Sequence, residues 1–274
     1  MTDNMRFDLQ DGKRVLLKYT GDDHHVVIPP GVTEIGGSAF TGCESLNSVV
    51  IPGSVRKIGS SAFSGCYNLV SVVIPPGVTE IGDRAFEDCS DLESVVIPPG
   101  VTRIGVEAFA NCDSLQSVVI PEGVTRIGNW AFSSCSSLQS VVIPAGVTEI
   151  GSWAFYCCSS LQSVVIPTGV TRIGDKAFSC CSSLQSVVIP EGVTEIGDAA
   201  FDGCANLQSV VIPQGVEENW IMFRGTPYLN QIPGELQIID HKILRYRGTA
   251  SEVVIPPGMN AIGGFAFFGC SSLQ

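Results

Sequence analysis

Residues 141–163 read VVIPAGVTEIGSWAFYCCSSLQS, one complete unit of the pattern that decides this fold. The unit recurs every 23 residues, without insertion or deletion, up to Ser209. Its copies begin at Val26, Val49, Val72, Val95, Val118, Val141, Val164 and Val187. A fixed period of this length predicts a solenoid, because a unit so short cannot bury its own apolar face and must stack on its neighbours.

Each unit is expected to contain a strand, a turn, a second extended segment and a helical turn. Apolar residues spaced along one helical face predict the helical turn, at Ala131, Phe132, Cys135 and Leu138, with the four intervening serines facing solvent. The β-branched run 141–143 predicts a strand that ends at the following proline, and residues 147–151 predict the second extended segment. Strands of stacked coils are expected to form a parallel sheet with a spacing of about 4.8 Å.

The same unit resembles the BspA-like branch of the leucine-rich repeats. The residues that carry this resemblance are Ile127, Ala131, Phe132, Cys135, Leu138, Val141, Ile143 and Pro144, and every contiguous repeat fills the same positions. The resemblance implies a right-handed, non-enzymatic leucine-rich-repeat solenoid with β-hairpin insertions. It also implies a role as an adhesion or protein-binding module on a bacterial or protist cell surface.

The chain divides into four predicted regions. Residues 1–25 are expected to form an N-terminal β-hairpin cap, with a turn at Asp11-Gly12, and residues 26–209 hold eight contiguous repeats. Residues 210–252 hold a degenerate repeat and a second hairpin with a turn near Asp240-His241. Residues 253–274 hold a further repeat that stops where earlier coils enter their strand, so we expect Phe267 and Leu273 to be left exposed.

Composition restricts the class of partner and the compartment. Hydrophobic residues make up 45% of the 274-residue chain and charged residues 15%, which indicates a folded protein. The net charge is −12 and Lys and Arg do not cluster, which argues against nucleic acid as a partner. No apolar run is long enough for a membrane span and no signal peptide precedes the repeats. As written, the chain is expected in the cytoplasm; as a mature fragment, it is expected at the cell surface or secreted.

Nine of the eleven cysteines recur at one repeat position: Cys43, Cys66, Cys89, Cys112, Cys135, Cys158, Cys181, Cys204 and Cys270. A cysteine flanked in every coil by inward Phe and Leu is expected to be a small buried hydrophobe with a free thiol. The off-register Cys157 and Cys180 are expected to face outward on neighbouring coils, as free thiols or as an inter-coil disulfide. Adjacent cysteines point apart, so a zinc site is not expected.

Nothing in the sequence indicates catalysis or a cofactor. The three histidines, His24, His25 and His241, have no fixed spacing to a Ser or Cys nucleophile. The glycines do not form a phosphate-binding loop, and no Asp-rich calcium loop occurs. We therefore predict no enzyme activity, no metal and no cofactor.

Two surfaces are candidates for binding a protein partner. Val142 should face outward between the inward Val141 and Ile143, and valine fills this position in every coil. An exposed row of this kind exceeds the apolar patch that a monomer normally shows to water. The candidate residues on the row are Val96, Val119, Val142, Val165 and Val188.

Trp130 and Trp153 occupy one repeat position in consecutive coils, with Tyr156 close by. Most other coils carry a polar residue at this position, which favours exposure and a role in anchoring a partner. Mutual stacking of the two indoles is the alternative.

These features predict a protein-interaction module whose partner is an unidentified protein, with self-association as a further use of the valine row. The rival interpretation is a structural spacer within a longer surface protein, without a specific ligand. The repeated Ser-Leu-Gln-Ser-Val-Val-Ile-Pro favours the spacer, because specific binding usually diversifies exposed positions.

Overall fold

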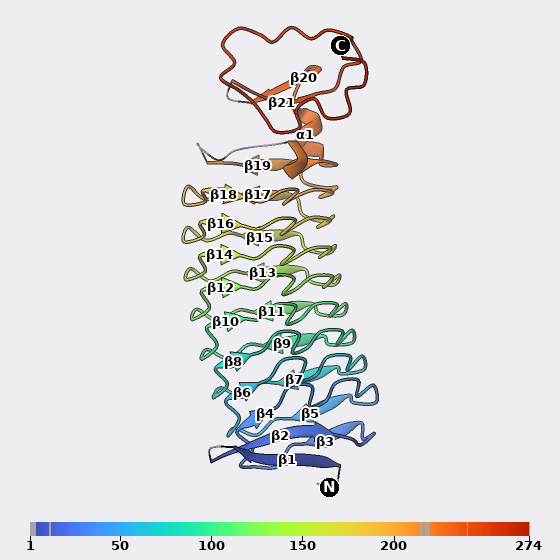
Figure 1. The fold of residues 1–274 in the computed structure, drawn as a ribbon, viewed down its shortest axis with the longest axis vertical. Helices are drawn as coiled ribbons and strands as arrows, with labels where there is room; N and C mark the ends of the chain where they lie inside the picture. The colour runs from blue at the N-terminus through green and yellow to red at the C-terminus, as the bar shows by residue number, and fades with distance from the viewer. Residues whose placement is uncertain (1–3, 11, 214–215, 217–219, 240, 274) are drawn as a thin grey trace.

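Two sheets of mainly parallel strands run along an elongated stack of coils in the computed structural model of the protein (Figure 1). The structure describes residues 4–10, 12–213, 216, 220–239 and 241–273. Each 23-residue coil contributes one short strand to each sheet, and equivalent residues of consecutive coils pair in register, for example Val118 with Val141. The predicted solenoid of 23-residue coils with a parallel sheet is therefore confirmed.

The first sheet has nine strands, which are formed by the Ser-Val-Val segments. Each strand is three residues long because proline, which has no amide proton to donate, follows two residues later. The strands are β3 (His25–Val27), β5 (Ser48–Val50), β7 (Ser71–Val73), β9 (Ser94–Val96), β11 (Ser117–Val119), β13 (Ser140–Val142), β15 (Ser163–Val165), β17 (Ser186–Val188) and β19 (Ser209–Val211).

The second sheet has ten strands, which are formed by the second extended segments and the N-terminal hairpin. Its hairpin strands are antiparallel, and β2 continues into the parallel part by pairing with β4. The strands are β1 (Met5–Gln10), β2 (Lys13–Tyr19), β4 (Glu34–Ile35), β6 (Lys57–Ile58), β8 (Glu80–Ile81), β10 (Arg103–Ile104), β12 (Arg126–Ile127), β14 (Glu149–Ile150), β16 (Arg172–Ile173) and β18 (Glu195–Ile196).

The chain beyond β19 forms two short helices and a third, three-stranded sheet. The helices are η1 (Trp220–Phe223) and α1 (Pro227–Gln231), and the strands are β20 (Leu236–Ile239), β21 (Lys242–Tyr246) and β22 (Ala261–Ile262). Strands β20 and β21 form the predicted second hairpin, and β22 pairs with β21 in parallel. Asp11, residues 217–219 of the degenerate repeat and Asp240 lie outside the described residues.

The segment predicted as a helical turn is a run of tight turns instead. Alternate amides bond within the coil and across to the next coil: Ala131 donates to the carbonyl of Gly128, whereas Phe132 donates to the carbonyl of Ala154. A helix would need every amide for its own i→i−4 ladder, and here half of the amides join coils. Trp130 and Ser134 take a positive φ of about 60° to make these turns. One of the serines expected at the surface, Ser133, is buried.

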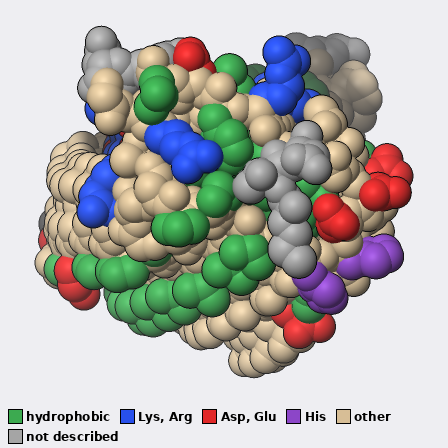
Figure 2. All heavy atoms as spheres, turned by 90° about the horizontal axis from the view of Figure 1, so that it is seen from below, with side chains coloured by type: hydrophobic (Ala, Val, Ile, Leu, Met, Phe, Trp, Pro, Cys, Tyr) green, Lys and Arg blue, Asp and Glu red, His purple; other side chains and the backbone are tan. Residues whose placement is uncertain are grey.

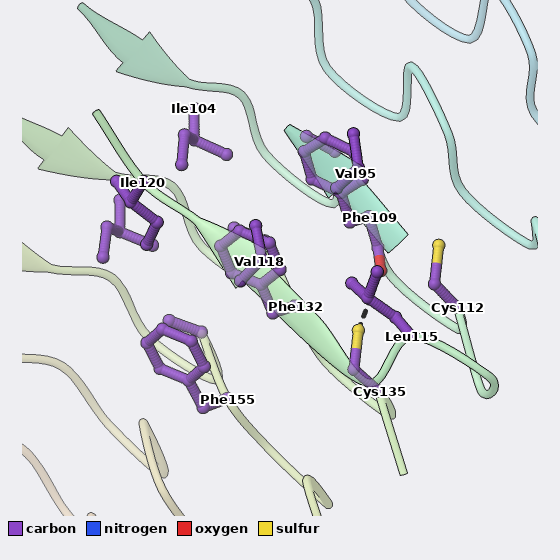
Figure 3. Packing of buried hydrophobic residues seen from close by; sticks show 14 of the residues in the cluster. Val95, Ile104, Phe109, Cys112, Leu115, Val118, Ile120, Phe132, Cys135 and Phe155 are labelled. Atoms are coloured by element: carbon purple, nitrogen blue, oxygen red, sulfur yellow. Dashed lines mark hydrogen bonds between the residues drawn. The ribbon is translucent and has the colours of Figure 1, made fainter. Parts of the chain in front are cut away.

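A column of phenylalanines forms the centre of the core (Figure 3). Phe109, Phe132 and Phe155 are fully buried, and their ring centroids are 5.4 Å apart with nearly parallel planes. Burying one large apolar side chain contributes roughly 1.5–3 kcal/mol, so each coil adds a similar increment to the stack. The column comprises Phe40, Phe63, Phe86, Phe109, Phe132, Phe155, Phe178 and Phe201.

Other side chains extend this column beyond the regular repeats. Tyr19 at the end of β2 packs on Phe40 with 5.2 Å between centroids, so the N-terminal hairpin covers the first coil. Phe223 in η1 stacks on Phe201 at 5.8 Å, and takes the place of the missing repeat phenylalanine. In the last coil Phe267 and Leu273, which were expected to be exposed, are half-buried.

Candidate interaction surface

A row of exposed valines follows the nine-stranded sheet, as predicted. In strand β13 the side chain of Val141 is buried, whereas that of Val142 faces solvent. This alternation follows from the two-residue period of a β-strand. The exposed fraction lies between 54% and 80% in all nine members of this valine ladder: Val27, Val50, Val73, Val96, Val119, Val142, Val165, Val188 and Val211.

The valine ladder is continuous because its strands pair in register. Val119 is aligned with Val142, and Val142 with Val165. In the view along the stack, hydrophobic side chains form an unbroken row on the surface (Figure 2). Neighbouring strands lie about 4.8 Å apart, so the side chains of aligned valines are too close for water to separate them.

The surface on the side that precedes the valine ladder is polar but uncharged over strands β11 to β19. Ser140 and Gln139 precede Val142 and are both exposed. The same two residue types stand in register in the neighbouring coils, at Gln116, Ser117, Gln162, Ser163, Gln185, Ser186, Gln208 and Ser209. Although the chain carries a net charge of −12, these two rows of Gln and Ser carry no charged side chain.

The ten-stranded sheet shows the opposite character, because charged side chains occupy its outer face. Glu149 lies between two arginines, with 3.1 Å to Nε of Arg126 and 3.0 Å to Nη1 of Arg172. Lys57 and Glu80 make a similar contact at 3.3 Å. Side chains of opposite charge meet at most steps between consecutive coils on this face, although Arg103 and Arg126 are like-charged neighbours. The sequence alone did not show this pairing.

The two candidate tryptophans stack on each other. The ring centroids of Trp130 and Trp153 are 4.3 Å apart with 6° between the planes, and Tyr156 packs edge-on to Trp153 at 4.7 Å. The ammonium group of Lys176 lies 4.1 Å from the centre of the Trp153 ring. All four side chains are half-buried. The exposure predicted for the tryptophans is therefore too high, and their mutual stacking is what the structure shows.

The thiols follow the predicted division between inward and outward positions. Cys112, Cys135 and Cys158 are fully buried, whereas Cys157 and Cys180 are half-buried. Cys43 and Cys270, at the two ends of the ladder, are also half-buried. Burial raises the pKa of the Cys66 thiol to about 12, so the thiols of this ladder stay protonated at neutral pH.

One contact between a histidine and a serine was not anticipated. His25 and Ser48 occupy equivalent positions of strands β3 and β5, and the imidazole Nδ1 lies 2.8 Å from the serine Oγ. A catalytic serine needs a base that is oriented by a third group and donors for an oxyanion. His25 is exposed on an open sheet and makes no such third contact within the described residues.

A cavity of about 350 Å³ lies between the N-terminal hairpin and the first coil. Tyr19, Asp23 and Cys43 line it, and the phenol of Tyr19 donates a 2.6 Å hydrogen bond to Asp23.

Within the described part of the chain, no three potential ligand side chains come together to hold a metal ion. No helix among the described residues has the length and hydropathy needed to cross a membrane.

The repeat pattern matches a known family along almost the whole chain. The family model for the BspA type leucine rich repeat region matches in 6 copies, over residues 17–136, 102–230 and 222–274. The chain belongs to the BspA-type leucine-rich repeat family. Repeats of this class are generally protein-interaction modules, because stacking creates a long continuous surface.

Solved structures of bacterial leucine-rich repeat proteins are similar to this family member. A protein from Bacteroides ovatus is 27% identical with a TM-score of 0.66, covering 100% of this chain and 80% of that chain. A protein from T. pallidum is 34% identical with a TM-score of 0.57, covering 76% and 89%. A third, from Eubacterium ventriosum, is 20% identical with a TM-score of 0.55 over 99% and 88%, and shows the shared fold alone. The sequence matches none of the curated proteins with which it was compared.

Proposed function

We propose that this repeat protein is a non-enzymatic interaction module that binds a partner protein through the valine ladder, centred on Val96, Val119, Val142, Val165 and Val188. The observation that carries the proposal is the exposure of nine aligned valines on a sheet face. Contiguous apolar surface of this extent is typical of an interaction site, because water exposure of so many aligned apolar groups is unfavourable.

The energetics favour a partner that covers most of the ladder. Full burial of one valine contributes roughly 1.5–3 kcal/mol, so three partly exposed valines contribute about 3–6 kcal/mol and nine contribute about 9–18 kcal/mol. Association itself costs about 4–15 kcal/mol in lost freedom of movement. Three valines supply an amount near the lower end of this cost, whereas the whole row supplies an amount that exceeds most of the range.

The other faces offer less to a partner. The charges of the ten-stranded sheet already interact with one another, as Glu149 does with Arg126 and Arg172. Separating such a surface pair from water yields little net energy. Trp130 and Trp153 already bury part of their rings against each other. A partner on the aromatic cluster would bury only the part of each ring that is still exposed.

By the family resemblance, the partner is a surface or matrix protein and the role is adhesion. The alternative function is a structural spacer without a ligand. The uniformity of the exposed Gln, Ser and Val rows favours this alternative, because identical coils offer no unique site. A binding experiment separates the two functions.

Binding is tested with a panel of purified extracellular-matrix proteins and with the protein itself, by biolayer interferometry and sedimentation. The variant V119T/V142T/V165T keeps β-branched side chains in exposed positions and is expected to fold like the parent. We expect the parent to bind at least one probe and the triple variant to bind it at least tenfold more weakly, because burying threonine leaves its hydroxyl without a partner.

Two further variants make the result interpretable. V118T/V141T/V164T alters the buried positions one residue away and is expected to unfold, which checks the strand phase. W130A/W153A removes the aromatic cluster and is expected to leave binding unchanged. Equal binding by the parent and the exposed-valine variant would contradict the valine ladder as the site. Absence of binding to every probe would favour the spacer.

A further inference from the structure

Cys157 and Cys180 occupy the same turn position in consecutive coils. Their backbone φ angles, 56° and 61°, are nearly equal, so the two turns present their side chains in the same direction. Both thiols are half-buried, and each is followed in sequence by a fully buried thiol of the regular ladder. The chain thus has two neighbouring thiols that solvent can reach.

The two turns are held in register by hydrogen bonds between the coils. The amide of Cys157 donates to the carbonyl of Ser179 at 2.9 Å, and that of Trp153 donates to the carbonyl of Asp175 at 2.8 Å. Coils stacked in this way are about 4.8 Å apart, within the range of about 4.4–6.8 Å that a disulfide needs between Cα atoms. The side chain of Cys157 also interacts directly with that of Cys180.

We propose that Cys157 and Cys180 form a reversible inter-coil disulfide, with a low-molecular-weight disulfide such as oxidised glutathione as the oxidant. One thiolate attacks the oxidant, forms a mixed disulfide and releases one small thiolate. The second cysteine thiolate then attacks the protein sulfur of that mixed disulfide and releases the second small thiolate. The two cysteines lose two electrons and two protons, and the oxidant becomes two thiols.

The neighbouring ladder thiols are equally close to one another but do not fit this chemistry. Cys158 and Cys181 are fully buried, and each donates its proton to a phenylalanine carbonyl, at 3.2 Å and 3.1 Å. An oxidant cannot reach them, and a thiol without access to water does not ionise readily. The comparison makes Cys158 and Cys181 a matched control for Cys157 and Cys180.

The disulfide adds a covalent link between coils that noncovalent contacts otherwise join. It closes beside the aromatic cluster, since Tyr156 interacts with Cys157 and packs against both tryptophans. Disulfides persist in oxidising compartments and are reduced in the cytosol. The link is therefore open in a reducing environment and closed outside the cell.

The test oxidises the fully reduced 274-residue chain with oxidised glutathione under native conditions. Remaining thiols are alkylated, and tryptic peptides are analysed by mass spectrometry. Trypsin cuts after Arg172 and Lys176, which lie between the two cysteines, so a bridge joins two separate peptides. We expect a loss of two thiols per chain, assigned by fragmentation to Cys157 and Cys180, together with quenched tryptophan fluorescence and a thermal midpoint several degrees higher.

Substitutions identify the residues independently. C157S and C180S introduce serine, which the equivalent position of a nearby coil already carries as Ser134 with φ of 59°, so both are expected to fold. They should form only a mixed disulfide with glutathione, whereas C158A and C181A should cross-link like the parent. A native parent that retains all its thiols, or a bridge between Cys158 and Cys181, overturns the proposal. The peptide assignment in the parent decides the question even where a variant does not fold.

Discussion

The thiol of Cys135 donates a hydrogen bond to the carbonyl oxygen of Phe109, 3.2 Å away in the preceding coil (Figure 3). The same bond joins consecutive coils along the core, from Cys66, Cys89, Cys112, Cys135, Cys158, Cys181 and Cys204. Cysteine is therefore more than a small apolar residue here, because in these seven coils its weak donor bonds to a buried carbonyl of the preceding coil.

This bond and its burial predict a difference in thiol reactivity. We expect an alkylating reagent to modify Cys89, Cys112 and Cys135 slowly in the native protein, because they become accessible only when the stack opens. Cys157 and Cys180 should react faster, since both are half-buried. Mass spectrometry of each cysteine peptide over time measures the rates. Similar rates at all five positions would show that the ladder thiols are not buried in solution.

Stability is predicted to fall at alkaline pH. Burial raises the pKa of Cys66 and Cys204 to about 12 in the folded state, against about 8.5 in the unfolded chain. The contribution of these two thiols to the free energy of unfolding is fully present below about pH 8.5. It is lost as the pH rises toward 12, because only the unfolded chain releases the thiol protons in this window. Urea unfolding at increasing pH measures the decline. C66A should reduce its slope, and an unchanged slope in that variant would rule out this cause.

A pair of glycine substitutions is predicted to show how closely neighbouring coils approach each other. A Cβ atom at Gly128 would lie 2.6 Å from the carbonyl oxygen of Gly105, so G128A forces two coils apart. We expect a loss of about 1–3 kcal/mol in the free energy of unfolding. The control is G53A, because a Cβ at Gly53 meets no atom within 4 Å. Chemical unfolding measures both variants, and equal stability would contradict the close coil contact.

The charged face is predicted to respond to loss of its central carboxylate. E149Q leaves Arg126 and Arg172 without the anion between them. We expect the substitution to lower the free energy of unfolding by about 0.5–1.5 kcal/mol at low salt. The effect should shrink at high salt, because these side chains are partly exposed. E80Q, which removes only the single contact with Lys57, should cost about half as much. Unfolding at two ionic strengths measures both, and a salt-independent loss would point to another cause.

The large features of the fold could be predicted from the repeat period. A residue and its equivalent 23 positions later are neighbours in any stack of such units, so the inward Val141 and the outward Val142 follow from strand alternation alone. The valine ladder and the buried cysteines were predicted for the same reason. The period also predicted which tryptophans lie on consecutive coils. It left open whether their rings are exposed for a partner or stack on each other, and the structure shows that they stack at 4.3 Å.

The sequence by itself determined the solenoid, its sheet and the side of each coil that faces the core, because apolar periodicity specifies burial. Only the tertiary structure decided the form of the Ala-Phe segment and the neutralisation of the charged face. Phe132 donates its amide to Ala154 of the next coil, and Glu149 pairs with arginines on both adjacent coils. Such partners lie outside the segment itself, and local spacing cannot show whether an amide or a carboxylate is satisfied within its own coil or by the next.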